Sequence, residues 1–164
     1  MGTGKTAVGT ALASNLGWPY LDTDELIEKK AGLKINKIFE KHGEKYFRDL
    51  EEKVIKSISN FNNYIIATGG GAVLRKENMN NLEKNGFIVN LHASRDVIYE
   101  RIKSNNERPL LNKPDPKGEI DRLLEERKQY YKRCDVSINT DNAAIVDLVE
   151  KIIEEINKGH HNSP

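Results

Sequence analysis

The chain opens on a glycine-rich stretch that could bind phosphate, GTGKT at residues 2–6. Gly4, Lys5 and Thr6 match the second half of the phosphate-binding loop G-x-x-x-x-G-K-[ST]. Backbone N–H groups of Gly2, Thr3 and Gly4 would point at phosphate oxygens from the start of a helix. Lys5 would reach the β- and γ-phosphates, and the Thr6 hydroxyl would bind Mg²⁺. The alternative is an ordinary glycine-rich helix start with a solvated lysine.

Two aspartates follow in YLDTDELIE, Asp22 and Asp24. They stand at the expected carboxyl end of a strand, where one carboxylate could lie near Mg²⁺ and the other near a hydroxyl to be phosphorylated. Phosphoryl transfer needs mainly positioning and charge neutralisation, which two such groups would supply. The alternative is that one of them only caps the following helix, since aspartate is favoured there.

The stretch ATGGGAV follows an expected buried strand and contains three successive glycines, Gly69, Gly70 and Gly71. Glycines allow a close approach of the backbone to a ligand or a positive φ. A plain tight turn is the alternative, although three glycines exceed what a turn requires.

Three arginines could bind an anion. Arg48 stands on a helix about 100° round from Phe47, with a surface pair to Glu44 or Glu52 as its alternative. Arg108 lies in a polar, proline-containing stretch that reads as a loop, and Arg127 lies on a later helix. Arginine forms planar, bidentate pairs with carboxylate or phosphate, and a loop arginine could close over a transferring phosphate. Arg108 or Arg127, taken alone, could equally be a solvated surface charge.

These residues require elements that bring them together. Short apolar runs alternate with longer amphipathic segments, a pattern typical of βαβ units with a parallel sheet covered on both sides. Strands are expected at 18–22, 64–67, 87–91 and 136–139. Helices are expected at 5–16, 24–31, 34–41, 43–60, 76–84, 95–103, 118–133 and 142–157. Ligands bind beyond the carboxyl ends of such strands, where most of the polar features fall.

The composition limits the class of protein. The chain has 164 residues, which fits one domain, and its 26 basic and 25 acidic residues give a net charge of +1. Near-balanced charge gives no reason to expect nucleic acid as a partner. Cys134 is the single cysteine, which suits a reducing cytosol. No apolar run approaches the roughly 18 residues of a membrane span, and no signal-peptide pattern opens the chain. We therefore expect a cytoplasmic protein with no membrane partner.

The chain resembles the shikimate kinase family over essentially its whole length. The resemblance is carried, in order, by GTGKT, DTDELIE, GEKYFR, TGGG, RPLL and an arginine four residues before a tyrosine. The combination is specific, although each piece alone is not. The resemblance implies an α/β fold, the P-loop kinase three-layer α/β/α sandwich, with a parallel sheet of order 2-3-1-4-5. It implies one domain over residues 1–158, with a substrate-binding region near 24–53 and a lid near 104–117. We expect residues 159–164 to be a disordered tail.

The resemblance also implies the reaction and the residue roles. The γ-phosphate of ATP would pass to the 3-hydroxyl of shikimate, in aromatic amino-acid biosynthesis, with ATP and Mg²⁺ bound by a monomer. The implied roles cover phosphate, metal, substrate and adenine. The catalytic residues would be Lys5, Asp24 and Arg108, and the metal would be bound by Thr6 and Asp22. Shikimate would be bound by Asp24, Arg48, Gly69, Gly70, Gly71 and Arg127. ATP would be bound by Gly2, Thr3, Gly4, Lys5, Thr6, Arg101 and Arg108. Arg101 and the segment near Thr140 and Asp141 would face the adenine.

The chain departs from the family at its start. The family's first strand and the first glycine of the phosphate loop are missing before Met1. That strand is central in the implied order, so its loss would orphan buried backbone groups at about 1–3 kcal/mol each. We expect the protein to begin one strand earlier; the alternatives are a truncated, poorly folded chain and a strand donated by a neighbouring chain. A kinase for another small hydroxyl compound and an inactive relative that only binds a ligand or partner remain alternative functions.

Overall fold

The computed structural model describes residues 2–103 and 114–161. The chain divides into two compact units, a first unit of Met1–Ala11 and Phe87–Pro164 and a second unit of Leu12–Gly86. The boundary falls inside helix α1 (Lys5–Leu16), whose bounds are those expected from the sequence.

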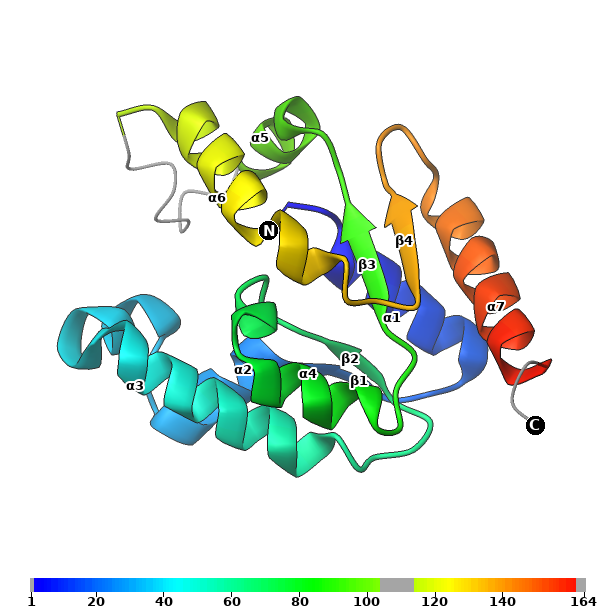
Figure 1. The fold of residues 1–164 in the computed structure, drawn as a ribbon, viewed down its shortest axis with the longest axis horizontal. Helices are drawn as coiled ribbons and strands as arrows, with labels where there is room; N and C mark the ends of the chain where they lie inside the picture. The colour runs from blue at the N-terminus through cyan, green and yellow to red at the C-terminus, as the bar shows by residue number, and fades with distance from the viewer. Residues whose placement is uncertain (1, 104–113, 162–164) are drawn as a thin grey trace. The chain divides into compact units, whose positions relative to one another are not determined.

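The second unit is built on two short parallel strands, β1 (Tyr20–Asp22) and β2 (Ile65–Ala67) (Figure 1). Tyr20 pairs with Ile65 and Asp22 with Ala67, so both strands end at the same edge. Asp22 closes β1 at that edge, and the three glycines follow β2 two residues beyond Ala67. The register therefore brings the aspartate pair and the glycines to one place, as expected for parallel strands.

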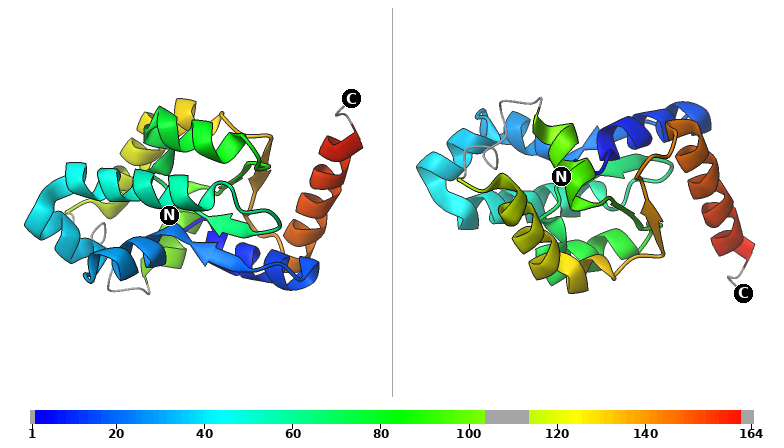
Figure 2. Two further views of the ribbon diagram at one scale, coloured as in Figure 1. Left: turned by 90° about the horizontal axis from the view of Figure 1, so that it is seen from below. Right: turned by 90° about the horizontal axis from the view of Figure 1, so that it is seen from above.

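Four helical segments complete the second unit. They are α2 (Thr23–Ala31), α3 (Ile35–Ile58), the 3₁₀ helix η1 (Ala72–Leu74) and α4 (Lys76–Glu83). Figures 1 and 2 show α2 beside α3, and contacts join α3 to both η1 and α4. The core gathers apolar side chains from one face of α3 against α2: Ile27, Ile38, Phe47, Leu50, Val54 and Ile58.

Helix α3 is interrupted at Gly43, whose φ of 78° and ψ of 173° are non-helical. This region of backbone space is open essentially to glycine alone. The sequence predicts two helices with a break between 41 and 43, and the structure confirms a break at that place. Figure 2 shows the first part of α3 turning away from the direction of its longer second part.

The first unit also contains two parallel strands, β3 (Val89–His92) and β4 (Val136–Asn139), with Val89 opposite Val136 and His92 opposite Asn139. Besides α1, its described residues form the helices α5 (Arg95–Lys103), α6 (Pro116–Tyr131) and α7 (Ile145–His161). A small core joins α5 to α6 through Ala93, Ile98, Ile102 and Ile120.

Several boundaries differ from the sequence expectation. Helix α6 begins at Pro116 rather than 118, because the side chain of Asp115 caps it by accepting from Gly118 N at 2.9 Å. Helix α7 begins at Ile145 rather than 142, since Asn142 has a φ of 54°. It continues to His161, so residues 159–161 of the expected tail are helical. Most of the expected lid, including Arg108, lies outside the described residues.

The predicted α/β class and the two expected neighbour pairs of strands are confirmed. β1 pairs with β2 and β3 with β4, as the implied order expects of its 2-3 and 4-5 neighbours. In the described ranges, no helix combines the length and apolar character that crossing a membrane requires.

Candidate active site

The aspartate pair opens the candidate site in the second unit. Asp22 accepts a hydrogen bond from the backbone N of Asp24 at 2.8 Å and thereby caps α2. Its second carboxylate oxygen has a longer contact from the Tyr20 hydroxyl, at 3.4 Å. The capping alternative is thus confirmed for Asp22, and Asp24 is left in the first turn of α2.

The triple glycine passes directly beside Asp24. A Cβ built on Gly69 would lie 2.9 Å from Asp24 Oδ1 and 3.3 Å from Glu51 Oε1. The backbone N of Gly69 donates to the buried hydroxyl of Thr23 at 3.2 Å, which ties this segment to α2. A side chain at position 69 would therefore displace the Asp24 carboxylate.

Gly71 passes close to the Arg48 side chain, as Gly69 does to Asp24. A Cβ on Gly71 would fall within contact distance of the Arg48 guanidinium, 2.6 Å from Nη1. Gly71 has a φ of −95°, and the three glycines are absent from the positive-φ residues of the described chain. Positive φ is therefore not the reason for these glycines; side chains of this chain fill the space beside Gly69 and Gly71, and the close approach to a ligand stays a prediction.

Arg48 is held inside the second unit. Its side chain is only 13% exposed, and its Nη1 donates to Glu51 Oε2 at 2.8 Å. Nη2 lies 3.3 Å from Glu44 Oε1, and the guanidinium carbon sits 5.1 Å from the centre of the Phe47 ring. The pair with Glu44 that the sequence allows is present, but the alternative of a surface arginine is wrong because Arg48 is only 13% exposed, and Glu52 pairs with Arg75 instead.

Glu51 is the residue that the sequence reasoning missed. Its side chain is 0% exposed, and its Oε1 has no hydrogen-bond partner among the described residues. Burial raises the pKa of the Glu51 carboxyl; Arg48 opposes this shift and the charge of Asp24 adds to it. One signal could have found it: Glu51 stands in the apolar stripe of α3, between Leu50 and Val54.

A second arginine fastens the glycine segment to α3. Arg75, which precedes α4, bonds to Asp49 Oδ1 at 2.6 Å and to Glu52 Oε2 at 2.8 Å. The hydrogen bond from Arg75 lowers the pKa of the Asp49 carboxyl. Arg75 thus links the chain just after the glycines to the helix that carries Arg48.

In the first unit, the stretch before α1 has the backbone of a glycine loop. Gly2 and Gly4 have positive φ values of 68° and 87°. A Cβ on Gly2 would come within 3.0 Å of the Ile98 and Ile102 side chains. Lys5 begins α1, with Thr6 exposed in its first turn, so both residues occupy the helix start that the sequence predicts.

Arg101 and Thr140 bind this loop from the other side. Arg101 Nη1 donates to Gly2 O at 3.3 Å and to Thr140 Oγ1 at 2.9 Å, and Nη2 donates to Thr140 O at 2.7 Å. The Thr140 hydroxyl lies 3.0 Å from Thr3 O. The resemblance puts Arg101 and the segment near Thr140 on the adenine side, which stays a prediction; the structure brings both residues to Gly2 and Thr3.

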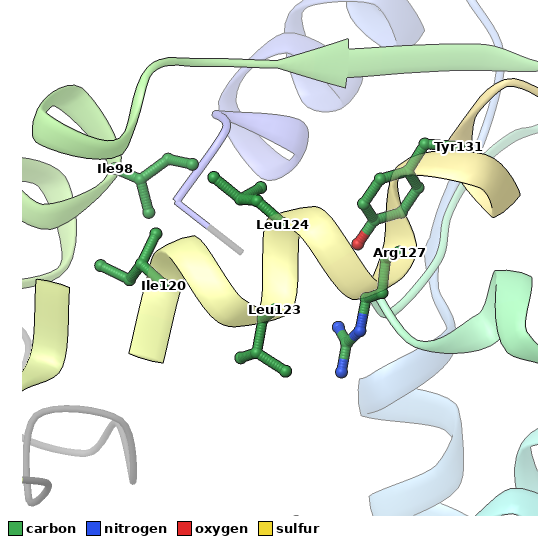
Figure 3. A pocket seen from close by; sticks show the side chains of 6 residues that line it. All are labelled: Ile98, Ile120, Leu123, Leu124, Arg127 and Tyr131. Atoms are coloured by element: carbon green, nitrogen blue, oxygen red, sulfur yellow. The ribbon is translucent and has the colours of Figure 1, made fainter. Parts of the chain in front are cut away.

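Arg127 lies elsewhere in the first unit, on α6. With Tyr131, one turn later, it lines a pocket whose other walls are apolar side chains of α5 and α6 (Figure 3). These are Ile98, Ile120, Leu123 and Leu124. The guanidinium extends on the same side of α6 as Leu123, while Ile98, Ile120 and Leu124 meet between the two helices (Figure 3).

The structure therefore groups the predicted residues in two sets. The second unit brings together Asp24, Arg48, Gly69 and Gly71, with Glu51 as an addition. The first unit brings together Gly2, Thr3 and Arg101, with Thr140 as the contact between them. A buried cation beside a carboxylate suits a ligand with both a carboxylate and hydroxyl groups.

Comparison with known proteins agrees with this geometry. Residues 1–157 match the sequence model of the family described as shikimate kinase. The shikimate kinase of Thermodesulfovibrio yellowstonii is 48% identical over 155 residues, covering 94% of this chain and 90% of the relative. That of Caldanaerobacter subterraneus subsp. tengcongensis is 45% identical over 153 residues, covering 93% of this chain and 90% of the relative.

A solved structure supports the same likeness. The shikimate kinase of Acinetobacter baumannii, in complex with shikimate, superposes with a TM-score of 0.91 at 36% identity. The alignment covers 97% of this chain and 89% of that one.

Proposed function

The chain belongs to the shikimate kinase family, and from this premise we propose that it transfers the γ-phosphate of ATP to the 3-hydroxyl of shikimate. The chain is an ATP-dependent phosphotransferase with the P-loop kinase fold. The product would enter aromatic amino-acid biosynthesis.

The observation that carries the assignment is the meeting of Asp24, Arg48 and the triple glycine within the second unit. Arg48 would bind the substrate carboxylate, because a guanidinium forms bidentate bonds to such a group. Asp24 would bind the acceptor hydroxyl and take its proton. Backbone groups of Gly69, Gly70 and Gly71 would contact the substrate where a side chain would otherwise stand.

The nucleotide would use the loop of the first unit. Backbone N–H groups from Gly2 to Gly4 would bind phosphate oxygens, with Lys5 on the β- and γ-phosphates. Arg101 would stay on the adenine side. Arg127 would add a second cation for the substrate carboxylate, and Arg108 would neutralise charge on the transferring phosphate.

Mg²⁺ fits the donors that the sequence offers. Thr6 supplies a hydroxyl and Asp22 a carboxylate, and hard oxygen ligands are those that Mg²⁺ prefers. One oxygen of Asp22 accepts the α2 cap bond, and the contact given for its other oxygen among the described residues is the 3.4 Å one from Tyr20. That oxygen keeps acceptor capacity for a metal-bound water. The ion would offset the negative charge of the phosphates.

The location, oligomeric state and partners of the protein are also part of the proposal. We place the protein in the cytoplasm as a monomer, with ATP and shikimate as its small-molecule partners and without nucleic acid or membrane. The near-balanced charge and the single cysteine support this placement.

The test is ATP turnover by the purified protein with shikimate, quinate and gluconate as acceptors. We expect phosphorylation of shikimate with clear preference over the other two. Equal use of all three would point to a kinase of another specificity, and shikimate binding without turnover would point to an inactive relative. Lys5→Ala, which removes the phosphate-binding cation, is the control for a contaminating kinase.

A further inference from the structure

Thr140 is a buried polar residue in the segment that the resemblance places on the adenine side, and its hydroxyl has been given no task of its own. Its side chain is 1% exposed, although it lies at the turn that follows β4. It contacts three segments that are remote in sequence: the glycine loop, the end of β3 and Arg101 of α5. A buried hydroxyl with several partners indicates a fixed position.

The direction of each hydrogen bond follows from the donors available. Arg101 can only donate, so the Thr140 oxygen accepts from Nη1 at 2.9 Å. The single hydroxyl proton has two possible acceptors, Thr3 O at 3.0 Å and His92 O at 3.3 Å. His92 O already accepts from the backbone N of Thr140 at 2.8 Å. Thr3 O is also the nearer of the two acceptors, and we assign the hydroxyl proton to it.

These bonds fix two successive peptide groups of the loop. The carbonyl of Gly2 accepts from Arg101, and the carbonyl of Thr3 accepts from Thr140. In a planar trans peptide the C=O and the next N–H point in opposite directions. Holding these two carbonyls on the protein side turns the N–H groups of Thr3 and Gly4 the other way, as phosphate binding requires.

We propose that Thr140 is a positioning residue of the nucleotide site, whose hydroxyl orients the Thr3–Gly4 peptide and holds Arg101 against the same loop. It acts through the loop and touches no reacting atom. The inference rests on the proposed function of residues 2–6 as the phosphate-binding loop.

The decisive variant is Thr140→Val, which keeps the shape of the side chain and removes only the hydroxyl. We expect the KM for ATP to rise by about tenfold, as for a lost buried hydrogen bond. The KM for shikimate should stay within experimental error. ADP affinity, measured by calorimetric titration, should fall by the same factor. Thr140→Ser, which keeps the hydroxyl, should restore both values.

Thr10→Val is the matched control. Thr10 lies on α1 near the same loop, and its exposed hydroxyl bonds only to Thr6 O and Ala7 O of its own helix among the interactions described. We expect it to leave both KM values unchanged. If valine at 140 lowers the yield of folded protein, Thr140→Cys replaces it, because a thiol is a weak donor of similar size.

Two results would overturn the inference. One is an unchanged KM for ATP in a folded Thr140→Val protein, and the other is a serine variant as impaired as the valine variant. Lys5→Ala separates the premise from the inference. If Lys5→Ala left ATP kinetics intact, the loop assignment would fail, and Thr140 would lose its role with it.

Discussion

Arg48 is held in place by residues of its own helix before any substrate arrives. Glu51 and Glu44 bond to its guanidinium, and the Phe47 ring lies beneath it. Arginine has a large rotamer entropy, so a fixed guanidinium has less freedom to lose on binding. At the residue scale, this preorganisation of Arg48 lowers the entropy cost of binding a substrate at the candidate site.

Arg48→Ala should damage the use of shikimate and spare that of ATP. A hydrogen bond to a charged group is worth about 1.5–3 kcal/mol, so the KM for shikimate should rise by about 10- to 150-fold. Arg48→Lys should recover only part of this loss, since lysine lacks the bidentate fork. Steady-state kinetics with each substrate varied in turn is the measurement. Equal loss for ATP and shikimate would contradict the assigned role.

Gly71→Ala should act through Arg48. Its new Cβ would displace the guanidinium, and a shift of about 1 Å in a positioning group can cost about 100-fold in rate. We expect kcat/KM for shikimate to fall accordingly in a folded protein. The control is the double variant with Arg48→Ala, in which the alanine at 71 should add little. Additive losses would show that glycine is needed for another reason.

At the scale of elements, helix α3 connects the glycine segment to the substrate side chains. Arg48 and Glu51 lie toward the glycines, and Asp49 and Glu52 bind Arg75 from the segment that follows them. Arg75 therefore ties the segment that follows the glycines to two residues of α3, Asp49 and Glu52, which stand next to Arg48 and Glu51 in the sequence. The ion pairs are partly exposed, so their role in alignment exceeds their contribution to stability.

Arg75→Gln should separate the contribution of Arg75 to stability from its role in aligning the glycine segment. We expect a small fall in melting temperature and a several-fold rise in the KM for shikimate, with the KM for ATP unchanged. High salt should produce part of the same change in the wild-type protein, because it screens partly exposed pairs. Arg122→Gln is the control, since Arg122 pairs only with Glu119 and Glu126 of its own helix among the pairs described. A similar rise in that variant would rule out a specific role for Arg75.

The sequence predicts elements better than contacts. Helix α1 and strand β4 have their expected bounds, because apolar spacing and flanking turn residues are local signals. Asp24 and Gly69 are brought together because the parallel strands β1 and β2 end at one edge, and Arg48 joins them because α3 packs against α2 and η1. Thr140 and Thr3 are 137 residues apart, and Arg75 and Asp49 are 26 apart. Such pairings depend on tertiary packing, which local patterns do not contain.

At the scale of the whole molecule, one buried carboxyl links folding stability to pH. The folded pKa of Glu51 is raised above its ordinary value of 4.5, first by burial. A raised pKa means that folding favours the protonated form. Its contribution to the free energy of unfolding is complete below about pH 4.5 and is lost as pH rises through the folded pKa.

Glu51→Gln puts an uncharged amide, similar in shape to the protonated carboxyl, at this position at every pH. The free energy of unfolding of this variant, minus that of the wild type, should therefore grow as pH rises from about 4.5. Urea unfolding across a pH series measures it. Glu28→Gln is a control of opposite sign. Partial burial raises the pKa of Glu28, but bonds from Lys34 and from the Ile35 amide outweigh it and lower the pKa. A flat difference for Glu51→Gln would contradict the prediction.

The two carboxylates around Arg48 also bear on how many protons accompany substrate binding. A substrate carboxylate at Arg48 would be the third negative group on one cation. Glu51 is the buried partner whose protonation restores the balance, and its Oε1, which has no hydrogen-bond partner in the part of the chain that the structure describes, offers a place for that proton. Shikimate would then bind together with a fraction of a proton from solution. The heat of binding should consequently change with the ionisation enthalpy of the buffer, and Glu51→Gln should abolish that dependence.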